Sequence, residues 1–179
     1  MKRYALSAVG RDRPGIVAAV TKALYEHDCN IEDSTMTILE DEFAIILIMT
    51  MPDETDLNSL LKDVRKAEKE MGLAINIKEI PPRAKPSAPG SNYIITLHGA
   101  DRAGIVYRTA KILSDMGINI TDLETKAVHG EEEKVYIMVL EVYAPKDILI
   151  KRLEEEFKEL EKTLGVTIKI KPIEAFEPL

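Results

Sequence analysis

A short loop that combines glycine, aspartate and arginine occurs twice in this chain and carries the residue types best suited to hold a small charged ligand. The two loops span residues 10–15 (GRDRPG) and 99–104 (GADRAG), and each precedes apolar residues with helical spacing. A helix N-terminus presents free N–H groups and a partial positive charge, which can hold a carboxylate. Asp12 and Asp101 supply a carboxylate that can bind an ammonium group. An anion site beside a carboxylate suits a zwitterionic amino acid.

The residue types leave a second interpretation of these loops open. An aspartate followed by a glycine near a helix start is typical of an N-cap and a tight turn. Pro14 also fits the first turn of a helix, where the N–H that proline lacks would have no partner within the helix. Arg13 and Arg102 are more often solvated surface residues than ligand clamps. A ligand loop and a purely structural turn are therefore both compatible with the spacing.

Two asparagines occupy matching positions after the predicted helices. Asn30 and Asn119 each begin a strand, so they should lie near the far end of the helix from the loop. An asparagine at such a point often only closes a turn. Within one copy the asparagine would be distant from the loop, but across an interface it can reach the loop of a neighbour.

The remaining reactive side chains predict no catalytic, metal or cofactor site. Cys29 is the only cysteine; it follows a helix end and has no adjacent Lys or Arg to lower its pKa, so we expect a structural role. His27, His98 and His129 fall on different elements and show no metal-binding spacing. The acidic run at 131–133 is typical of a solvated hairpin tip. Because no nucleophile–base arrangement is found either, we expect a protein that is not an enzyme.

The loops belong to a longer internal repeat. One register without a gap aligns residues 10–33 with residues 99–122. Between the copies lies a segment rich in Pro, Ala and Ser, which is typical of a linker. The sequence therefore predicts four parts: a first domain at 1–80, a linker at 81–91, a second domain at 92–172 and a C-terminal tail at 173–179.

Each copy carries the same order of predicted elements. In the first copy we expect a strand at 4–9, a helix that starts within 11–14, strands at 30–40 and 42–51, a helix at 57–71 and a strand at 73–80. In the second we expect a strand at 93–98, a helix at 103–116, two strands flanking 129–133, a helix with an apolar face from Leu149 to Leu164, and a strand at 166–170. Asp28 and its counterpart Gly117 should mark helix ends with left-handed backbone. This order predicts an α+β chain of two ferredoxin-like domains, each a four-stranded antiparallel sheet with two helices on one face.

Two of the predicted strands are apolar on both faces. Residues 43–49 (FAIILIM) and 135–140 (VYIMVL) do not alternate as half-solvated antiparallel strands do. A two-helix layer covers only one face of a sheet, and soluble proteins avoid a large exposed apolar patch. We therefore expect the two copies to pack on each other, the chain to form a homodimer, or both.

The composition argues against a nucleic-acid-binding, membrane-spanning or secreted protein. The 179 residues carry 24 Lys and Arg against 31 Asp and Glu, a net charge of −7, which argues against direct binding of nucleic acid. We expect neither a membrane-spanning helix nor a secretory signal, because no apolar stretch is long enough and the apolar start runs into the charged residues 10–13. A lone cysteine suits a reducing compartment, so we expect a cytoplasmic protein.

The two loops, each followed by Asn-Ile, resemble the ACT domain, a small-molecule-sensing regulatory module. The resemblance covers both copies and implies a ferredoxin-like fold that associates through sheets and helices. It implies a ligand site of Asp12, Arg13, Pro14 and Gly15 with Asn30 in the first copy. In the second copy it implies Asp101, Arg102, Ala103 and Gly104 with Asn119. The expected ligand is a small amino acid such as glycine or serine, and the expected partner is a regulatory protein.

Two alternatives stay open beside the sensing role. The chain can be an interaction module that binds no ligand and docks on an enzyme or transcription factor. The first copy also resembles the amino-terminal ACT-like segment of formyltetrahydrofolate deformylase, but a second copy stands here in place of a catalytic domain. Ala103 departs from Pro14 of the first copy, so the two loops need not bind equally well.

Overall fold

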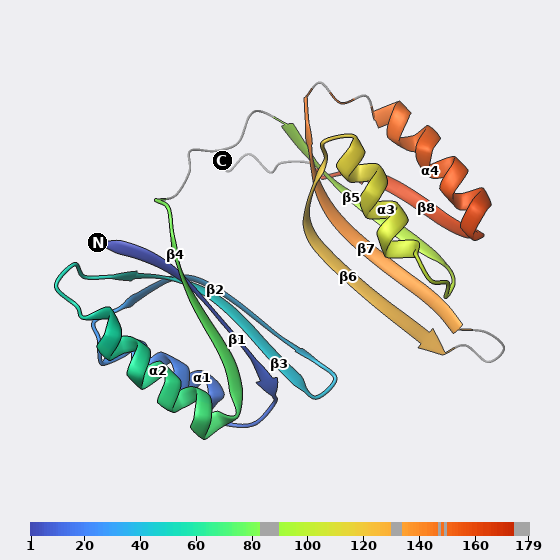
Figure 1. Ribbon diagram of the computed structural model, residues 1–179. Helices are drawn as coiled ribbons and strands as arrows, with labels where there is room; N and C mark the ends of the chain where they lie inside the picture. The colour runs from blue at the N-terminus through green and yellow to red at the C-terminus, as the bar shows by residue number, and fades with distance from the viewer. Residues whose placement is uncertain (83–89, 130–133, 147, 149, 174–179) are drawn as a thin grey trace, which may run out of the picture. The chain divides into compact units, whose positions relative to one another are not determined.

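The computed structural model describes residues 1–82, 90–129, 134–146, 148 and 150–173. The chain divides into two compact units, Met1–Lys85 and Pro86–Leu179, and each unit is described by itself. Both have the order strand–helix–strand–strand–helix–strand, so the predicted ferredoxin-like α+β fold is confirmed in each unit (Figure 1).

In the first unit the two helices cover one face of the sheet. The sheet order is β2-β3-β1-β4, and β1 pairs antiparallel with both β3 and β4 (Figure 1). The elements are β1 (Lys2–Arg11), α1 (Ile16–Tyr25), β2 (Asn30–Leu39), β3 (Glu42–Met51), α2 (Leu57–Met71) and β4 (Leu73–Ile80).

The second unit repeats this topology with the sheet order β6-β7-β5-β8. Its elements are β5 (Gly90–Ala100), α3 (Ile105–Asp115), β6 (Asn119–His129), β7 (Lys134–Pro145), α4 (Ile150–Leu164) and β8 (Val166–Pro172). The first strand begins earlier than expected, because Gly90 and Ser91, placed in the linker by the sequence, pair with Pro145 and Ala144. Leu149, the hairpin tip at 130–133 and the tail at 174–179 lie outside the described residues.

The core of each unit follows from the two periodicities of the sequence. On β1, Tyr4, Leu6 and Ala8 alternate inward, and on α2, Leu60 and Val64 recur on one face, as burial against a shared core requires. The second unit has an equivalent core of its own. Each unit therefore has its own hydrophobic core, which is what a domain requires to fold independently.

The ends of the first helices match the prediction from Asp28 and Gly117. Asp28 has φ 54° and Gly117 has φ 67°, so both adopt left-handed backbone after α1 and α3. The starts of these helices differ from the prediction, since α1 begins at Ile16 and α3 at Ile105, behind Gly15 and Gly104. The later helix starts leave residues 12–15 and 101–104 outside the helices, in the loops of the candidate site.

The sheet face without helices carries exposed apolar side chains in both units. Ile46 on β3 is 49% exposed and Val9 on β1 is 48% exposed. In the second unit Val135, Ile137 and Val139 of β7 are each exposed by more than a third. The predicted apolar second face is therefore present on each sheet. That another protein surface packs on this face stays a prediction.

Candidate functional site

The loop between β1 and α1 does not start the helix with an aspartate cap. The backbone N–H of Asp12 donates to the carbonyl oxygen of Asp41 at 2.7 Å, which fixes the loop to the β2–β3 turn. The N-cap of α1 is Gly15, whose φ of 96° is left-handed and costs a glycine little. The prediction that Asp12 caps the helix is therefore wrong, and the Asp12 side chain is left on an exposed loop.

The first helix of each unit has an N-terminus that no side chain caps. Gly15 before α1 and Gly104 before α3 offer no side-chain acceptor, and none is found from elsewhere in the described part of the chain. α2 provides the contrast, because its N-cap Asp56 accepts hydrogen bonds from the N–H groups of Asn58 at 3.1 Å and Ser59 at 3.3 Å. An uncapped N-terminus keeps its N–H groups and partial positive charge available to a carboxylate.

Both loops are docked on the end of the second helix of their own unit. A Cβ on Gly10 would lie 2.8 Å from the carbonyl oxygen of Gly72, and a Cβ on Gly99 would lie 2.9 Å from that of Gly165. Gly72 and Gly165 both have left-handed backbone just after α2 and α4. The close approach of two backbones therefore sets the position of each loop.

The loop arginines strengthen this docking. Arg13 Nη2 donates a hydrogen bond to the carbonyl oxygen of Glu70 and lies 3.5 Å from the sulfur of Met71, at the end of α2. The guanidinium of Arg102 lies against Gly165, with its atoms 3.8–3.9 Å from the place of a Cβ there. A cation at a helix C-terminus also interacts favourably with the helix dipole. Arg13 thus positions its loop by a hydrogen bond, and Arg102 lies beside the end of α4 in the second unit; the sequence revealed neither contact.

Loss of the Arg13 side chain should loosen the loop. We expect Arg13→Ala to lower the free energy of unfolding of the first domain by about 1 kcal/mol, because the Glu70 carbonyl oxygen loses a charge-assisted hydrogen bond at an exposed site. Chemical denaturation followed by circular dichroism measures this change. Arg11→Ala, at an exposed neighbour, is the control, and an equal effect of both variants would contradict the positioning role.

The two predicted asparagines line equivalent surface hollows. Asn30 lies in a hollow of about 520 Å³ formed by the end of α1 and the start of β2. Asn119 lies in a hollow of about 470 Å³ formed by the end of α3 and the start of β6. A β-bulge follows each asparagine on its edge strand. The repeat is therefore a repeat of surface shape as well as of sequence.

The loop and the asparagine of one unit do not form one site. They lie at opposite ends of α1, which has ten residues and is thus about 15 Å long. A ligand of amino-acid size cannot span that distance. Gly15 and Asn30 act on one ligand only if they come from two different units.

The two hollows differ in the side chains that line them, and such differences can change which ligand each hollow prefers. The first is lined by Thr21, Tyr25 and Cys29, and the second has Ala110, Ser114 and Ile118 at the same positions. Burial, with a smaller effect of Asp28, raises the pKa of the Cys29 thiol, and its Sγ lies 3.7 Å from the carbonyl oxygen of His27. A raised pKa lowers the fraction of reactive thiolate, and the structural role of Cys29 stays a prediction.

A histidine–aspartate contact joins the segment between α1 and β2 to α2. His27 Nε2 lies 2.9 Å from Asp63 Oδ2, and the His27 side chain is 12% exposed. Thr55 donates a hydrogen bond to the carbonyl oxygen of His27 at 3.4 Å. The second unit has Met116 and Glu156 at the equivalent positions, so this contact belongs to the first unit.

Acid should weaken the first domain through Asp63. The hydrogen bond with His27 holds the pKa of Asp63 below its usual value, so the contact stabilises the fold above about pH 4 and is lost as the pH falls below that. We expect Asp63→Asn to reduce the loss of thermal stability between neutral and acidic pH. Glu156→Gln in the second domain is the matched control. An unchanged acid dependence in Asp63→Asn would contradict the role of this contact.

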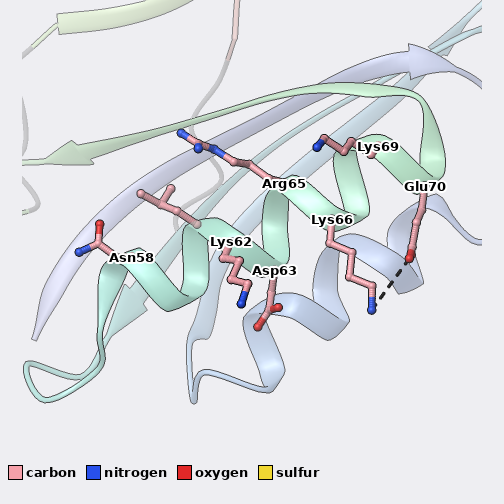
Figure 2. A pocket seen from close by; sticks show the side chains of 8 residues that line it. Asn58, Lys62, Asp63, Arg65, Lys66, Lys69 and Glu70 are labelled. Atoms are coloured by element: carbon pink, nitrogen blue, oxygen red, sulfur yellow. Dashed lines mark ion pairs between the residues drawn. The ribbon is translucent and has the colours of Figure 1, made fainter.

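A basic surface on α2 was not predicted as a site. Lys62, Arg65, Lys66 and Lys69 share the outer face of this helix and line a hollow of about 780 Å³ together with Asn58, Leu61, Asp63 and Glu70 (Figure 2). Their spacing of three, four and seven residues is visible in the sequence and is the signal that would have revealed the surface.

The described residues contain no group of three or more His, Cys, Asp or Glu side chains that could hold a metal ion. In the same part of the chain, no helix is both long and apolar enough to cross a membrane.

The fold and the repeated site define a protein of two ferredoxin-like domains, each with an uncapped helix N-terminus and an asparagine-lined hollow. The chain belongs to the ACT domain family, whose model matches residues 4–78 and 92–171. Two ACT domains in tandem therefore account for most of the sequence.

Similar proteins match either most of the tandem or a segment of one-domain length. The glycine cleavage system transcriptional repressor of Escherichia coli is 26% identical over 158 residues, which cover 87% of this chain and 82% of the repressor. A UPF0237 protein of Methanopyrus kandleri is 34% identical over 79 residues, 44% of this chain and 88% of that protein.

Solved structures show the same tandem fold. An unknown protein from Galdieria sulphuraria has a TM-score of 0.80 at 24% identity, covering 97% of this chain and 99% of that one. A structure described as a putative glycine cleavage system transcriptional repressor has a TM-score of 0.67 at 18% identity, covering 97% of this chain and 98% of that one.

Proposed function

We propose that this protein is a regulator that senses a small amino acid, such as glycine or serine, and passes the signal on by contact with a second protein. The observation that carries the proposal is the uncapped N-terminus of α1 and of α3, each behind a left-handed glycine and beside an exposed aspartate. The similarity to a protein named as a transcriptional repressor supports a regulatory role.

In the first domain the ligand carboxylate would accept hydrogen bonds from the N–H groups that follow Gly15. The carboxylate of Asp12 would bind the ammonium group, while Arg13 and Pro14 hold the loop in shape. Asn30 of a different unit would close the site with its side-chain amide. This division of roles satisfies the charges at both ends of an amino acid.

The second loop would bind with a different affinity. Asp101, Arg102 and Gly104 repeat the first loop, with Asn119 as the matching asparagine, but Ala103 stands where the first loop has Pro14. Proline fixes φ and has no N–H, whereas alanine frees φ and restores that N–H. Ala103 thus adds flexibility and one more donor to the second loop.

Signalling requires that the ligand favours one arrangement of units over another, since equal binding to both transmits nothing. A difference of about 1–3 kcal/mol between arrangements suffices for regulation. A site shared between two units meets this requirement because it exists only in the arrangement that brings loop and asparagine together. We therefore also propose that the units associate, within the chain or in a homodimer, in the cytoplasm.

A calorimetric screen of the twenty amino acids against ligand-free protein tests this proposal. We expect a small amino acid to bind at millimolar concentration or below, and Asp12→Ala with Asp101→Ala to abolish the heat of binding. Asp56→Ala is a control, because it removes a carboxylate from the N-terminus of α2 instead. The absence of binding by any amino acid would contradict sensing and leave the fold untouched.

The second candidate is an interaction module without a ligand. The exposed apolar faces of both sheets favour it, because they can mediate contacts whether or not a ligand is present. This role would be supported if no amino acid gave a heat of binding and the association of the units stayed the same in the presence of every amino acid. Neither role involves catalysis, in keeping with the expectation that the protein is not an enzyme.

A further inference from the structure

The outer face of α2 concentrates the positive charge of the first domain. Lys62, Arg65, Lys66 and Lys69 are here called the basic stripe. The central pair, Arg65 and Lys66, lies three or four residues from Lys62 on one side and from Lys69 on the other. The stripe holds four of the ten Lys and Arg residues in 1–80, against fifteen Asp and Glu. A domain with a negative net charge thus carries a compact cationic surface.

The charges of the stripe are mostly not neutralised within their own domain. Lys66 forms an ion pair with Glu70 at a long distance of 4.0 Å, and its side chain is 72% exposed (Figure 2). In the part of the chain that the structure describes, the other three members of the stripe form no ion pair. Asp63, the nearest carboxylate in sequence to Lys62, forms its hydrogen bond with His27, while Lys62 and Lys66 lower its pKa only as weaker contributions without an ion pair.

The fold itself does not require this charge. At the equivalent positions α4 has Glu155, Lys158, Glu159 and Lys162, two cations and two anions. Lys162 and Glu159 form an ion pair at 2.7 Å, so this face is balanced internally. Two helices with the same place in the fold thus differ in surface charge, which points to a role of the stripe outside the domain.

The chemistry around the stripe restricts the partner. A second copy docked by the same face would bring like charges together, which costs energy. A nucleic acid would be repelled by Asp63 and Glu70 on one side of the stripe and by the net charge of the domain. A protein helix with carboxylates three and four residues apart matches both the length and the spacing of the stripe. The apolar side chain of Leu61 at the edge of the hollow offers an additional contact.

We propose that the basic stripe on α2 is the docking surface for an acidic helix of a partner protein. This inference rests on the proposed function for the existence of a protein partner. It places the contact on the first domain, and the second domain has no equivalent surface on α4. The His27–Asp63 contact ties the segment between α1 and β2, which also holds Cys29, to this helix.

Fluorescence anisotropy with a labelled helical peptide of about 20 residues, long enough to form a helix, tests the proposal. Glutamates at three- and four-residue intervals form its acidic face, with leucines beside them, and a second peptide has glutamine in place of glutamate. The full chain is used without any amino acid, so that failure here is separate from failure of amino-acid sensing. The stripe variant carries Lys62→Gln, Arg65→Gln, Lys66→Gln and Lys69→Gln. The matched control carries Lys151→Gln, Arg152→Gln, Lys158→Gln and Lys162→Gln on α4.

We expect the wild type to bind the acidic peptide and the stripe variant to bind it about tenfold more weakly, since each exposed ion pair contributes a modest amount. Binding should weaken between about 50 mM and 200 mM salt, and the α4 control should match the wild type. Circular dichroism verifies that both variants are folded. Equal binding by the stripe and α4 variants, equal binding of the glutamine peptide, or no binding at all would overturn the proposal. A preference for duplex DNA, or a salt-dependent oligomer lost in the stripe variant, would overturn it in favour of those partners.

Discussion

A single methyl group at position 10 should destabilise the first domain strongly. We expect Gly10→Ala to lower its free energy of unfolding by about 2 kcal/mol, because the new Cβ would lie 2.8 Å from the carbonyl oxygen of Gly72. That oxygen belongs to the backbone at the end of α2 and cannot rotate away as a side chain can. The loop must move instead, which also displaces Asp12 and Gly15. Urea denaturation followed by circular dichroism measures the loss, and amino-acid titration measures the effect on the loop.

The repeat provides an internal comparison for this variant. Gly99→Ala should destabilise the second domain in the same way, since its Cβ would lie 2.9 Å from the carbonyl oxygen of Gly165. Arg11→Ala changes an exposed neighbour on the same strand and should cost much less. If Gly10→Ala were as mild as Arg11→Ala, the docking of the loop on α2 would not hold it in place.

A charge on the bare face of the first sheet should disrupt association. Ile46 is 49% exposed in the middle of β3, between Ser7 on β1 and Thr35 on β2. If this face is covered in solution, Ile46→Glu buries an unpaired carboxylate and should weaken association by about a hundredfold or more. Light scattering gives the mass of the particle and small-angle X-ray scattering gives its radius of gyration.

The two readouts separate the two ways of covering the face. A halved mass indicates a homodimer, and an expanded particle of unchanged mass indicates packing of the two units within one chain. Ser59→Glu adds the same charge to an exposed position on α2 and should change neither quantity. A wild-type chain that is already monomeric and extended would show that the apolar faces have no cover.

The fold could be predicted because its determinants are local or repeated. The gapless alignment of 10–33 with 99–122 reveals two copies, and strand and helix periods within each copy give the order of elements. The left-handed backbone at Asp28 and Gly117 is a property of single residues at a helix end. The exposed apolar face follows from the failure of residues 43–49 to alternate. Each of these signals needs no knowledge of distant contacts.

The candidate loop could be predicted only in part because its shape depends on contacts across the chain. The sequence suggests that Asp12 begins the helix, but the backbone of Asp12 is fixed by Asp41 and the helix starts behind Gly15. Arg13 and Glu70 are 57 residues apart, and neither residue type reveals that the one lies at the end of the helix of the other. The basic stripe was not predicted because the apolar residues of the same helix dominate the sequence pattern of residues 57–71.

The most direct test of the account is a nuclear magnetic resonance titration of the full chain with the amino acid that gives the strongest calorimetric response. We expect the largest changes in amide chemical shift on the first turns of α1 and α3, at residues 16–18 and 105–107, and on Asn30 and Asn119. Changes confined to other elements, or saturable binding that leaves both first turns unmoved, would contradict the claim that the uncapped helix N-termini hold the ligand.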